Sequence, residues 1–111
     1  MIIEDYFAID GTYELVDGLY NVDGDVELIE LVEKLPCKFF IVTGSFWCFN
    51  NNLTSLEGCP EEVGRNFSCS SNNLTSLKGC PKSIGGDFWC DDNLYNTKEY
   101  RQHKIMKKLR S

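Results

Sequence analysis

The sequence contains no segment long enough to cross a membrane as an apolar helix. Its longest apolar run, Phe39–Val42, has the length of a strand and falls far below the ~20 residues needed to span a bilayer. Residues 1–5 reach two carboxylates without a basic group or an apolar run, so they do not resemble a secretory signal. From these absences we expect a cytoplasmic protein with no membrane partner.

Residues typical of catalytic and metal centres are also scarce. His103 is the only histidine among 111 residues, and the sequence has no Gly-rich phosphate loop, no H-E-x-x-H motif and no recognisable pair of nucleophile and base. The six cysteines include no C-x-x-C pair, and in a cytoplasmic protein we interpret them as reduced thiols that fill a core. We therefore expect no enzyme, no metal and no cofactor, with His103 facing solvent.

Positive charge is both scarce and unevenly placed. Eleven Lys and Arg stand against 17 Asp and Glu, which gives a net charge of -6. A surface of this sign repels polyanions, so a protein partner with a basic patch is favoured over nucleic acid. Residues 1–45 hold ten acids and two bases, whereas residues 95–111 hold six bases and one acid. The two ends should therefore attract different groups.

The most informative feature of the sequence is a repeat with a step of 21 residues. Residues 46–60 and 67–81 are identical at eleven of fifteen positions, and a third copy begins at Phe88 and ends after Asn93. A period of roughly 20–29 residues is typical of solenoids, in which stacked coils bury the apolar side that one coil leaves open.

The pattern within each copy resembles the leucine-rich repeat. The first copy places Phe46 and Cys48 at inward strand positions, Asn51 at the asparagine position and Leu53 after it. Side chains two residues apart face the same side of a strand, and an asparagine amide can pair with backbone groups of two coils. In the third copy, Tyr95 replaces the leucine.

The segment N-x-L-T-S-L-x-G-C-P also resembles small repeat proteins of tailed bacteriophages and bacteria, over about residues 22–94. This resemblance is specific for fold and says little about chemistry. It implies a phage or bacterial accessory protein that binds a host protein and blocks it, or one that acts in antiviral defence.

These patterns predict a single α+β domain over residues 1–111, a short leucine-rich-repeat solenoid of about three and a half parallel coils. Residues 1–23 should form an N-terminal hairpin cap, with turn signals at Asp10-Gly11 and Asp17-Gly18. Residues 24–96 should form the coils, and an enlarged or extra strand is expected near residues 39–42.

The end of the chain predicts a capping helix over residues 97–111. Thr97 is a preferred N-cap residue, and the segment after it contains no Gly or Pro. An apolar stripe should lay the helix over the last coil; its members are Tyr100, Ile105, Met106 and Leu109.

The outward residues of the strands predict a protein-binding groove on the concave face. Trp47 and Trp89 should lie two strands apart, at about 9.6 Å, and flank small serines. Tryptophan is enriched at interface hot spots. The alternative is that Trp47 only packs on Phe49 and residues 39–43. The predicted protein-binding residues are Trp47, Phe49, Ser68, Ser70, Asp87, Trp89 and Asp91.

The basic C-terminal helix offers a second candidate function. Its cations could contact the phosphates of a nucleic acid, or they could be solvated and stabilise the helix C-terminus through its dipole. The candidate phosphate-binding residues are Lys98, Arg101, Lys104, Lys107, Lys108 and Arg110.

Overall fold

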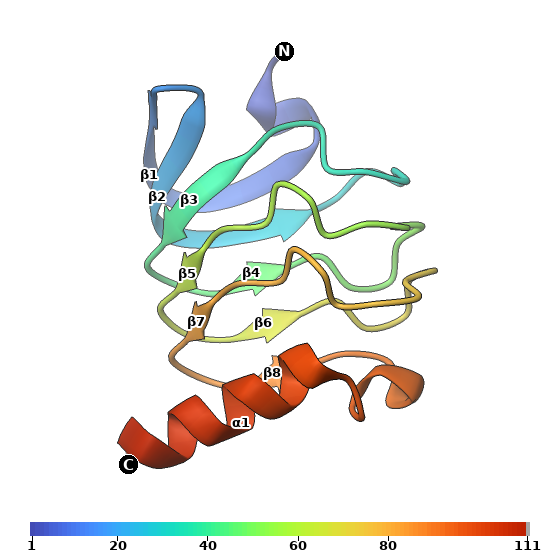
Figure 1. The fold of residues 1–111 in the computed structure, drawn as a ribbon. Coiled ribbons are helices and arrows are strands. Elements are labelled where there is room, and N and C mark those ends of the chain that lie inside the picture. The colour runs from blue at the N-terminus through green and yellow to red at the C-terminus, as the bar shows by residue number, and fades with distance from the viewer. Residues whose placement is uncertain (111) are drawn as a thin grey trace.

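The computed structural model describes the backbone of residues 1–110 and the side chains of residues 1–106. It is a parallel-strand solenoid of about three turns, preceded by an N-terminal hairpin and followed by one C-terminal helix (Figure 1), as predicted. In chain order the elements are η1 (Ile3–Asp5), β1 (Phe7–Val16), β2 (Leu19–Leu28), β3 (Phe39–Val42), β4 (Phe46–Trp47), β5 (Glu62–Val63), β6 (Phe67–Ser68), β7 (Ser83–Ile84), β8 (Phe88–Trp89), η2 (Asp92–Leu94) and α1 (Lys98–Arg110).

The antiparallel hairpin of β1 and β2 covers one end of the solenoid (Figure 1). Its turn lies at Asp17-Gly18, where both residues have positive φ (52° and 81°), as a two-residue hairpin turn requires. The prediction of a turn at Asp10-Gly11 is wrong, because both residues lie within β1. Gly11 instead faces Gly24 inside the hairpin, and a Cβ on either glycine would overlap the backbone of the opposite strand. The glycines therefore allow a close approach of two continuous strands.

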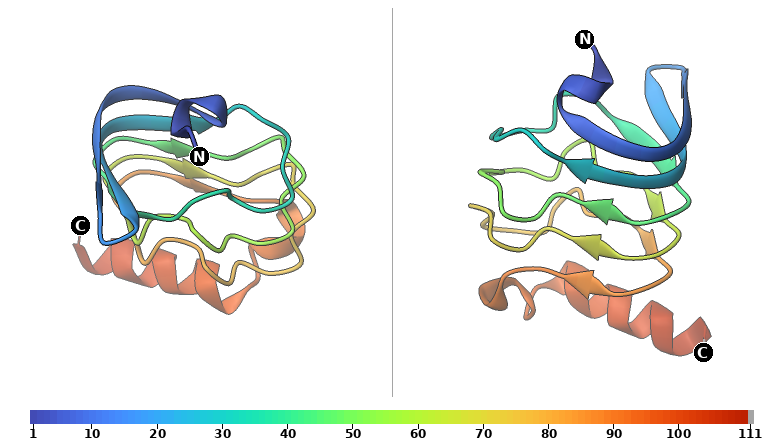
Figure 2. Two further views of the ribbon diagram at one scale, coloured as in Figure 1. Left: turned by 90° about the horizontal axis from the view of Figure 1, so that it is seen from above. Right: turned by 180° about the vertical axis from the view of Figure 1, so that it is seen from behind.

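Each coil contributes two short strands, and these stack in two parallel ladders that share β2 (Figure 2). One ladder runs through β2, β4, β6 and β8, with Phe46, Phe67 and Phe88 in register at the predicted step of 21 residues. The other runs through β2, β3, β5 and β7. The extra strand predicted at residues 39–42 is present. The sequence analysis did not predict that the next two coils have equivalent strands, β5 and β7.

The inward positions of the repeat fill the core between the ladders. Phe46 and Phe67 are fully buried, and their rings stack with centroids 6.1 Å apart. Cys48 and Cys69 are also fully buried, so cysteine serves here as a small apolar residue. Burying a Phe or Leu side chain contributes about 1.5–3 kcal/mol, and each coil supplies this burial to its neighbours.

Asparagine side chains join neighbouring coils, as the repeat predicts. The Oδ1 atom of Asn72 accepts the Leu53 N–H (2.9 Å), and its Nδ2 donates to the Cys48 carbonyl of the preceding coil (2.8 Å). One coil earlier, Asn51 Oδ1 accepts the Val32 N–H (2.8 Å). These amides form hydrogen bonds with backbone groups beyond the ends of the strands, where those groups have no strand-to-strand partner.

The G-C-P sequence that closes each repeat forms a tight turn. The Cys59 N–H donates to the Leu56 carbonyl (3.0 Å), and Gly58 between them has a φ of 98°. A Cβ on Gly58 would lie 2.7 Å from the Cys37 carbonyl oxygen of the neighbouring coil. Glycine is therefore required both by the backbone conformation and by the close packing of coils.

Helix α1 lies across the last coil (Figure 1) and begins as predicted, because the Thr97 hydroxyl accepts the Tyr100 N–H (3.4 Å). The predicted apolar stripe is wrong beyond Tyr100. The side chains of Ile105 and Met106 are 54% and 40% exposed, since they lie on helix faces that turn away from the coil. The side chain of Leu109 lies outside the described residues.

Replacement of Asn72 by alanine tests the links between coils. Asn72→Ala removes an acceptor and donors whose backbone partners are then left unpaired, so we expect a loss of roughly 2–4 kcal/mol in the free energy of unfolding. Asn73→Ala is the matched control, because the Asn73 side chain is exposed; it should change stability by less than about 0.5 kcal/mol. Urea denaturation measures both, and equal losses would contradict this role of Asn72.

Candidate protein-binding surface

Three aromatic side chains project outward from the ladder of β2, β4, β6 and β8. Trp47 ends β4 and Trp89 ends β8, and both are in register with Ser68 of β6. Phe49 lies two residues after Trp47 and so faces the same side. Trp89 is 40% exposed, Phe49 is 42% exposed and Trp47 is half-buried. We call these three residues the aromatic patch.

The two tryptophans do not flank an open groove. Their indole rings lean over Ser68 and stack, with centroids 6.0 Å apart and planes at 17°. Ser68 is only 5% exposed beneath them. The rings meet because long side chains on alternate strands can close over a small residue between them. Trp47 also meets the Phe49 ring edge-on at 6.0 Å, so part of its surface is used in packing, as the alternative interpretation proposed.

The two acids of the predicted rim differ in their contacts. The Asp91 carboxylate accepts the N–H groups of Ser71 (2.7 Å) and Asn72 (3.4 Å), so it holds two coils together. Asp87 is exposed, and its own N–H donates to Asn66 Oδ1 (2.9 Å). Ser70 is half-buried beside the patch. Among the predicted polar residues, Asp87 is the exposed one.

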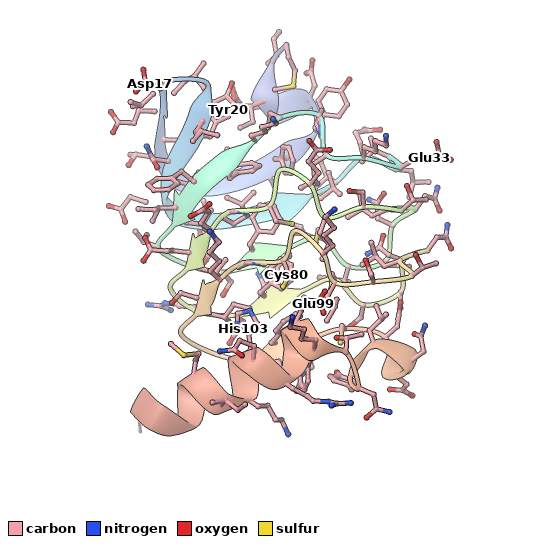
Figure 3. All side chains as sticks on the ribbon, viewed as in Figure 1. Asp17, Tyr20, Glu33, Cys80, Glu99 and His103 are labelled. Carbon is pink, nitrogen blue, oxygen red and sulfur yellow. The ribbon has the colours of Figure 1, made fainter. Side chains whose placement is uncertain are left out.

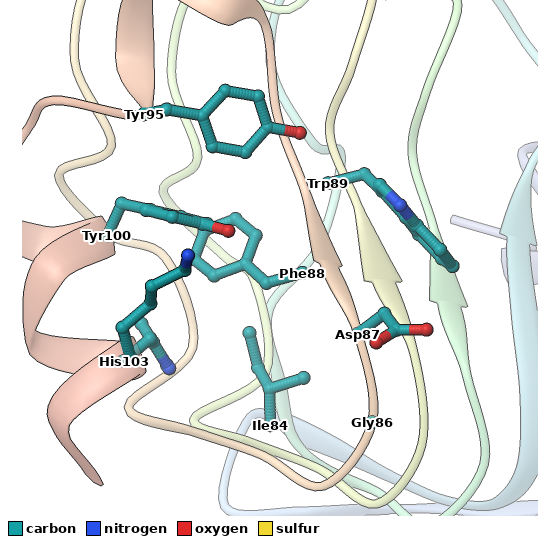
Figure 4. A pocket seen from close by; sticks show the side chains of 9 residues that line it. Ile84, Gly86, Asp87, Phe88, Trp89, Tyr95, Tyr100 and His103 are labelled. Carbon is teal, nitrogen blue, oxygen red and sulfur yellow. The ribbon is translucent and has the colours of Figure 1, made fainter. Parts of the chain in front are cut away.

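A pocket of about 330 Å³ lies between β8 and α1 and adjoins the patch through Trp89 (Figure 4). The pocket is missing from the sequence prediction. The signal for it was weak: an aromatic residue, Tyr95, in the leucine position of the last repeat. The lining residues are Ile84, Gly86, Asp87, Phe88, Trp89, Tyr95, Tyr100, His103 and Lys104.

Aromatic rings form much of the pocket wall. The Tyr100 ring packs edge-on against Tyr95 (4.7 Å) and against Phe88 (5.2 Å). Burial raises the pKa of the Tyr100 hydroxyl above its ordinary value, and the protonated group can donate a hydrogen bond to a ligand. Lys104 lies over the Tyr100 ring at 5.8 Å. Apolar walls with a few polar groups at the edge suit an apolar or aromatic side chain of a ligand.

His103 does not face solvent as expected. Its side chain extends from α1 toward Cys80 (Figure 3), with 3.9 Å between Nε2 and the Cys80 sulfur. Nε2 also contacts the Pro81 carbonyl oxygen, and the imidazole meets the Phe88 ring edge-on at 5.0 Å. His103 lies one helical turn from Tyr100, so these two residues dock the helix where an apolar stripe was predicted.

Three of the six candidate phosphate-binding residues have described side chains. Lys98, Arg101 and Lys104 are exposed on α1, but Arg101 donates to the Asn96 carbonyl (2.8 Å) and Lys104 contacts Tyr100. The other three side chains lie outside the described residues; they are Lys107, Lys108 and Arg110. Two of the three described bases are thus engaged, Arg101 with the segment before α1 and Lys104 with a ring of α1.

All six cysteines are free thiols, and most are core residues. Burial raises the pKa of Cys37 and Cys90 to about 11 and that of Cys80 to about 12. The pKa of Cys48 is raised by a hydrogen bond with Cys59 and by burial, and burial also raises that of Cys69. In the described part of the chain, no cluster of His, Cys, Asp or Glu is arranged to hold a metal ion.

A double-mutant cycle tests the indole stack. Trp47→Ala, Trp89→Ala and the double variant should give a coupling energy of about 0.5–1.5 kcal/mol in urea denaturation, because each substitution removes the same ring contact. Pairing Trp89→Ala with Tyr13→Ala is the control, since Tyr13 lies on the hairpin. That pair should be additive, and an additive tryptophan pair would contradict the stack.

Alkaline pH tests the buried thiols. The folded pKa values lie above the unfolded value of about 8.5, so their contribution to stability is complete below that pH and is lost as pH rises. Five thiols have raised pKa values, those of Cys37, Cys48, Cys69, Cys80 and Cys90, and their ionisation in the unfolded chain should lower the free energy of unfolding by roughly 3–4 kcal/mol between pH 7 and pH 9. Urea denaturation with a phosphine reductant measures the loss, and Cys69→Ala should reduce it by about a quarter. An unchanged stability would contradict the burial.

Comparison of the chain with known protein families, with curated proteins and with solved structures found no match. Among the described residues, no helix is long and apolar enough to cross a membrane. The candidate surface therefore rests on its geometry: an aromatic patch that continues into a pocket beneath α1.

Proposed function

We propose that this chain is a protein-binding module that docks a partner on the aromatic patch and its adjoining pocket. The observation that carries the proposal is Trp89, which is 40% exposed, stacks on Trp47 and also lines the pocket. One side chain thus joins a raised apolar surface to a hollow that can receive a partner side chain. No catalytic step is part of the proposal.

The energetics of this surface favour a protein ligand. Trp and other aromatic residues dominate interface hot spots, and fully burying one contributes about 1.5–3 kcal/mol. The stack holds the Trp89 indole in place before binding, so little side-chain entropy is lost when a partner covers it. Patch and pocket together supply the apolar centre that a hot spot needs.

The partner should carry basic groups around an apolar contact. Glu27 is exposed on β2 in register with Trp47, and Asp87 is exposed beside Trp89. The chain also has a net charge of -6. Charges of this sign at the rim speed the approach of a positively charged surface.

The repeat sequence supports a narrower version of the proposal. The leucine-rich pattern and its resemblance to small phage and bacterial repeat proteins suggest an intracellular accessory protein, whose partner is a host protein that it binds and blocks. The alternative within this proposal is that the chain is a component of antiviral defence. Both rest on the resemblance of the repeats.

Nucleic-acid binding through α1 is the second candidate function. It is favoured by the six bases and one acid of residues 95–111, of which Lys98, Arg101 and Lys104 are exposed. Binding of this kind would weaken steeply with salt, because phosphate contacts release counterions.

A pull-down from nuclease-treated bacterial lysate separates these functions. The wild type should retain a specific protein that Trp89→Ala with Phe49→Ala loses by at least about tenfold, since truncation of even one hot-spot aromatic costs about 2 kcal/mol. Leu15→Ala with Val16→Ala is the control, because these apolar side chains are exposed on β1, away from the aromatic patch and its pocket. Loss in both variants would contradict a role specific to the patch. Retention of nucleic acid before nuclease treatment, lost in Lys98→Ala with Arg101→Ala, would favour the second candidate.

A further inference from the structure

The second ladder carries a hollow that the aromatic patch does not use. Two depressions, of about 320 Å³ and 390 Å³, lie on its outer face and share Ile41 and Thr43 of the β3 segment. They therefore adjoin at these two residues, and the pair extends from the hairpin across β3 to β5 and β7. We call it the acidic trough, after the three carboxylates described below.

Packing between coils gives the trough its floor. Gly64 and Gly85 occupy equivalent positions after β5 and β7, and both line the second depression. A Cβ on Gly64 would overlap the Thr43 carbonyl oxygen, and a Cβ on Gly85 would overlap the Gly64 carbonyl oxygen. Neither position can carry a side chain, so the floor of the trough at Gly64 and Gly85 is bare backbone between residues that do have side chains.

The walls of the trough are acidic. Glu14 and Asp23 line the depression beside the hairpin, and Glu62 lines the one beside β5. Neither depression is lined by Lys, Arg or His, and none of the three carboxylates forms an ion pair with a described base. The side-chain oxygen of Asn21, cross-strand from Glu14, is enclosed and has no hydrogen-bond partner among the described residues. The exposed carboxylates of the wall thus offer hydrogen-bond acceptors, and no basic side chain lines either depression.

We propose that the acidic trough binds an extended basic segment of a partner polypeptide. The spacing of the acids fits such a ligand. Glu14 on β1 and Glu62 on β5 are three strands apart, which is about 14 Å at the spacing of paired strands. In an extended peptide, residues four positions apart lie about 13 Å apart on one face. Two bases separated by three residues would therefore reach both ends of the trough.

Other occupants fit less well. A helix with its side chains is about 10–12 Å across, whereas each depression has the volume of one or two side chains. A polyanion would be repelled by the three carboxylates. The trough and the aromatic patch lie on different ladders, so this inference does not depend on the function proposed for the patch.

Fluorescence anisotropy with a labelled peptide tests the inference directly. The probe is a threonine-valine peptide with two arginines separated by three residues, and its comparison peptide has the two arginines adjacent. Wild-type protein should bind the first more tightly. Glu14→Gln, Asp23→Asn and Glu62→Gln together should weaken binding about tenfold, because both arginines of the probe lose their carboxylate partners.

The matched control removes the same charge elsewhere. Glu30, Glu33 and Glu57 are exposed and lie outside the trough, so their combined change to Gln should weaken binding less than about twofold. Trp89→Ala should leave binding unchanged. In nuclear magnetic resonance spectra, the amide signals of Gly64 and Gly85 should shift on titration with the probe.

Several results would overturn the inference. They are an absence of probe binding to the wild type, equal weakening in the two glutamine variants, which would indicate attraction to net charge alone, and loss of binding in Trp89→Ala. Equal affinity for the two peptides would overturn the spacing argument and with it the extended orientation.

Discussion

No coil of this protein can enclose a core by itself, and the rest of the structure depends on that constraint. Backbone hydrogen bonds run from coil to coil: the Phe46 N–H donates to the Asn66 carbonyl and the Phe67 N–H to the Asp87 carbonyl, both at 2.9 Å. The same stacking buries the Phe column, and the hairpin and α1 cover the two ends. The place of every outward side chain then follows from the register of its coil.

Each coil bends between its two strands, at residues 43–45, 64–66 and 85–87, so the two ladders present two outer faces with different chemistry. Close packing at the bend excludes a Cβ at Gly64 and places side-chain acceptors beside backbone donors, as where Asp25 Oδ1 accepts the Ser45 N–H (2.7 Å). The outer face of the ladder with β4, β6 and β8 carries large aromatic residues, such as Trp89, whereas the other ladder is low along Gly64 and Gly85 and carries carboxylates. Two binding surfaces of different kinds can arise from a single repeat because its two strands face different directions.

The repeated parts of the chain were predictable, and the unrepeated parts were not. The step of 21 residues determined the register of Phe46 and Phe67, and Asn72 took its expected role, because each position is fixed by contacts with its own copy. The indole stack was missed, since strand spacing gives the separation of Cα atoms and not how side chains lean. The pocket beneath α1 and the inward place of His103 depend on how the helix docks, which happens once and leaves no periodic signal.

Native-state hydrogen exchange of the intact protein tests the interdependence of the coils most directly. The amides of Phe46, Cys48, Phe67 and Cys69 each donate to the next coil. If the coils are stable only together, these four amides should exchange with one common free energy that equals the free energy of unfolding from urea denaturation. Exchange of Phe67 and Cys69 through a separate, much lower opening energy, with Phe46 and Cys48 still protected, would show that coils unfold singly and would contradict the account.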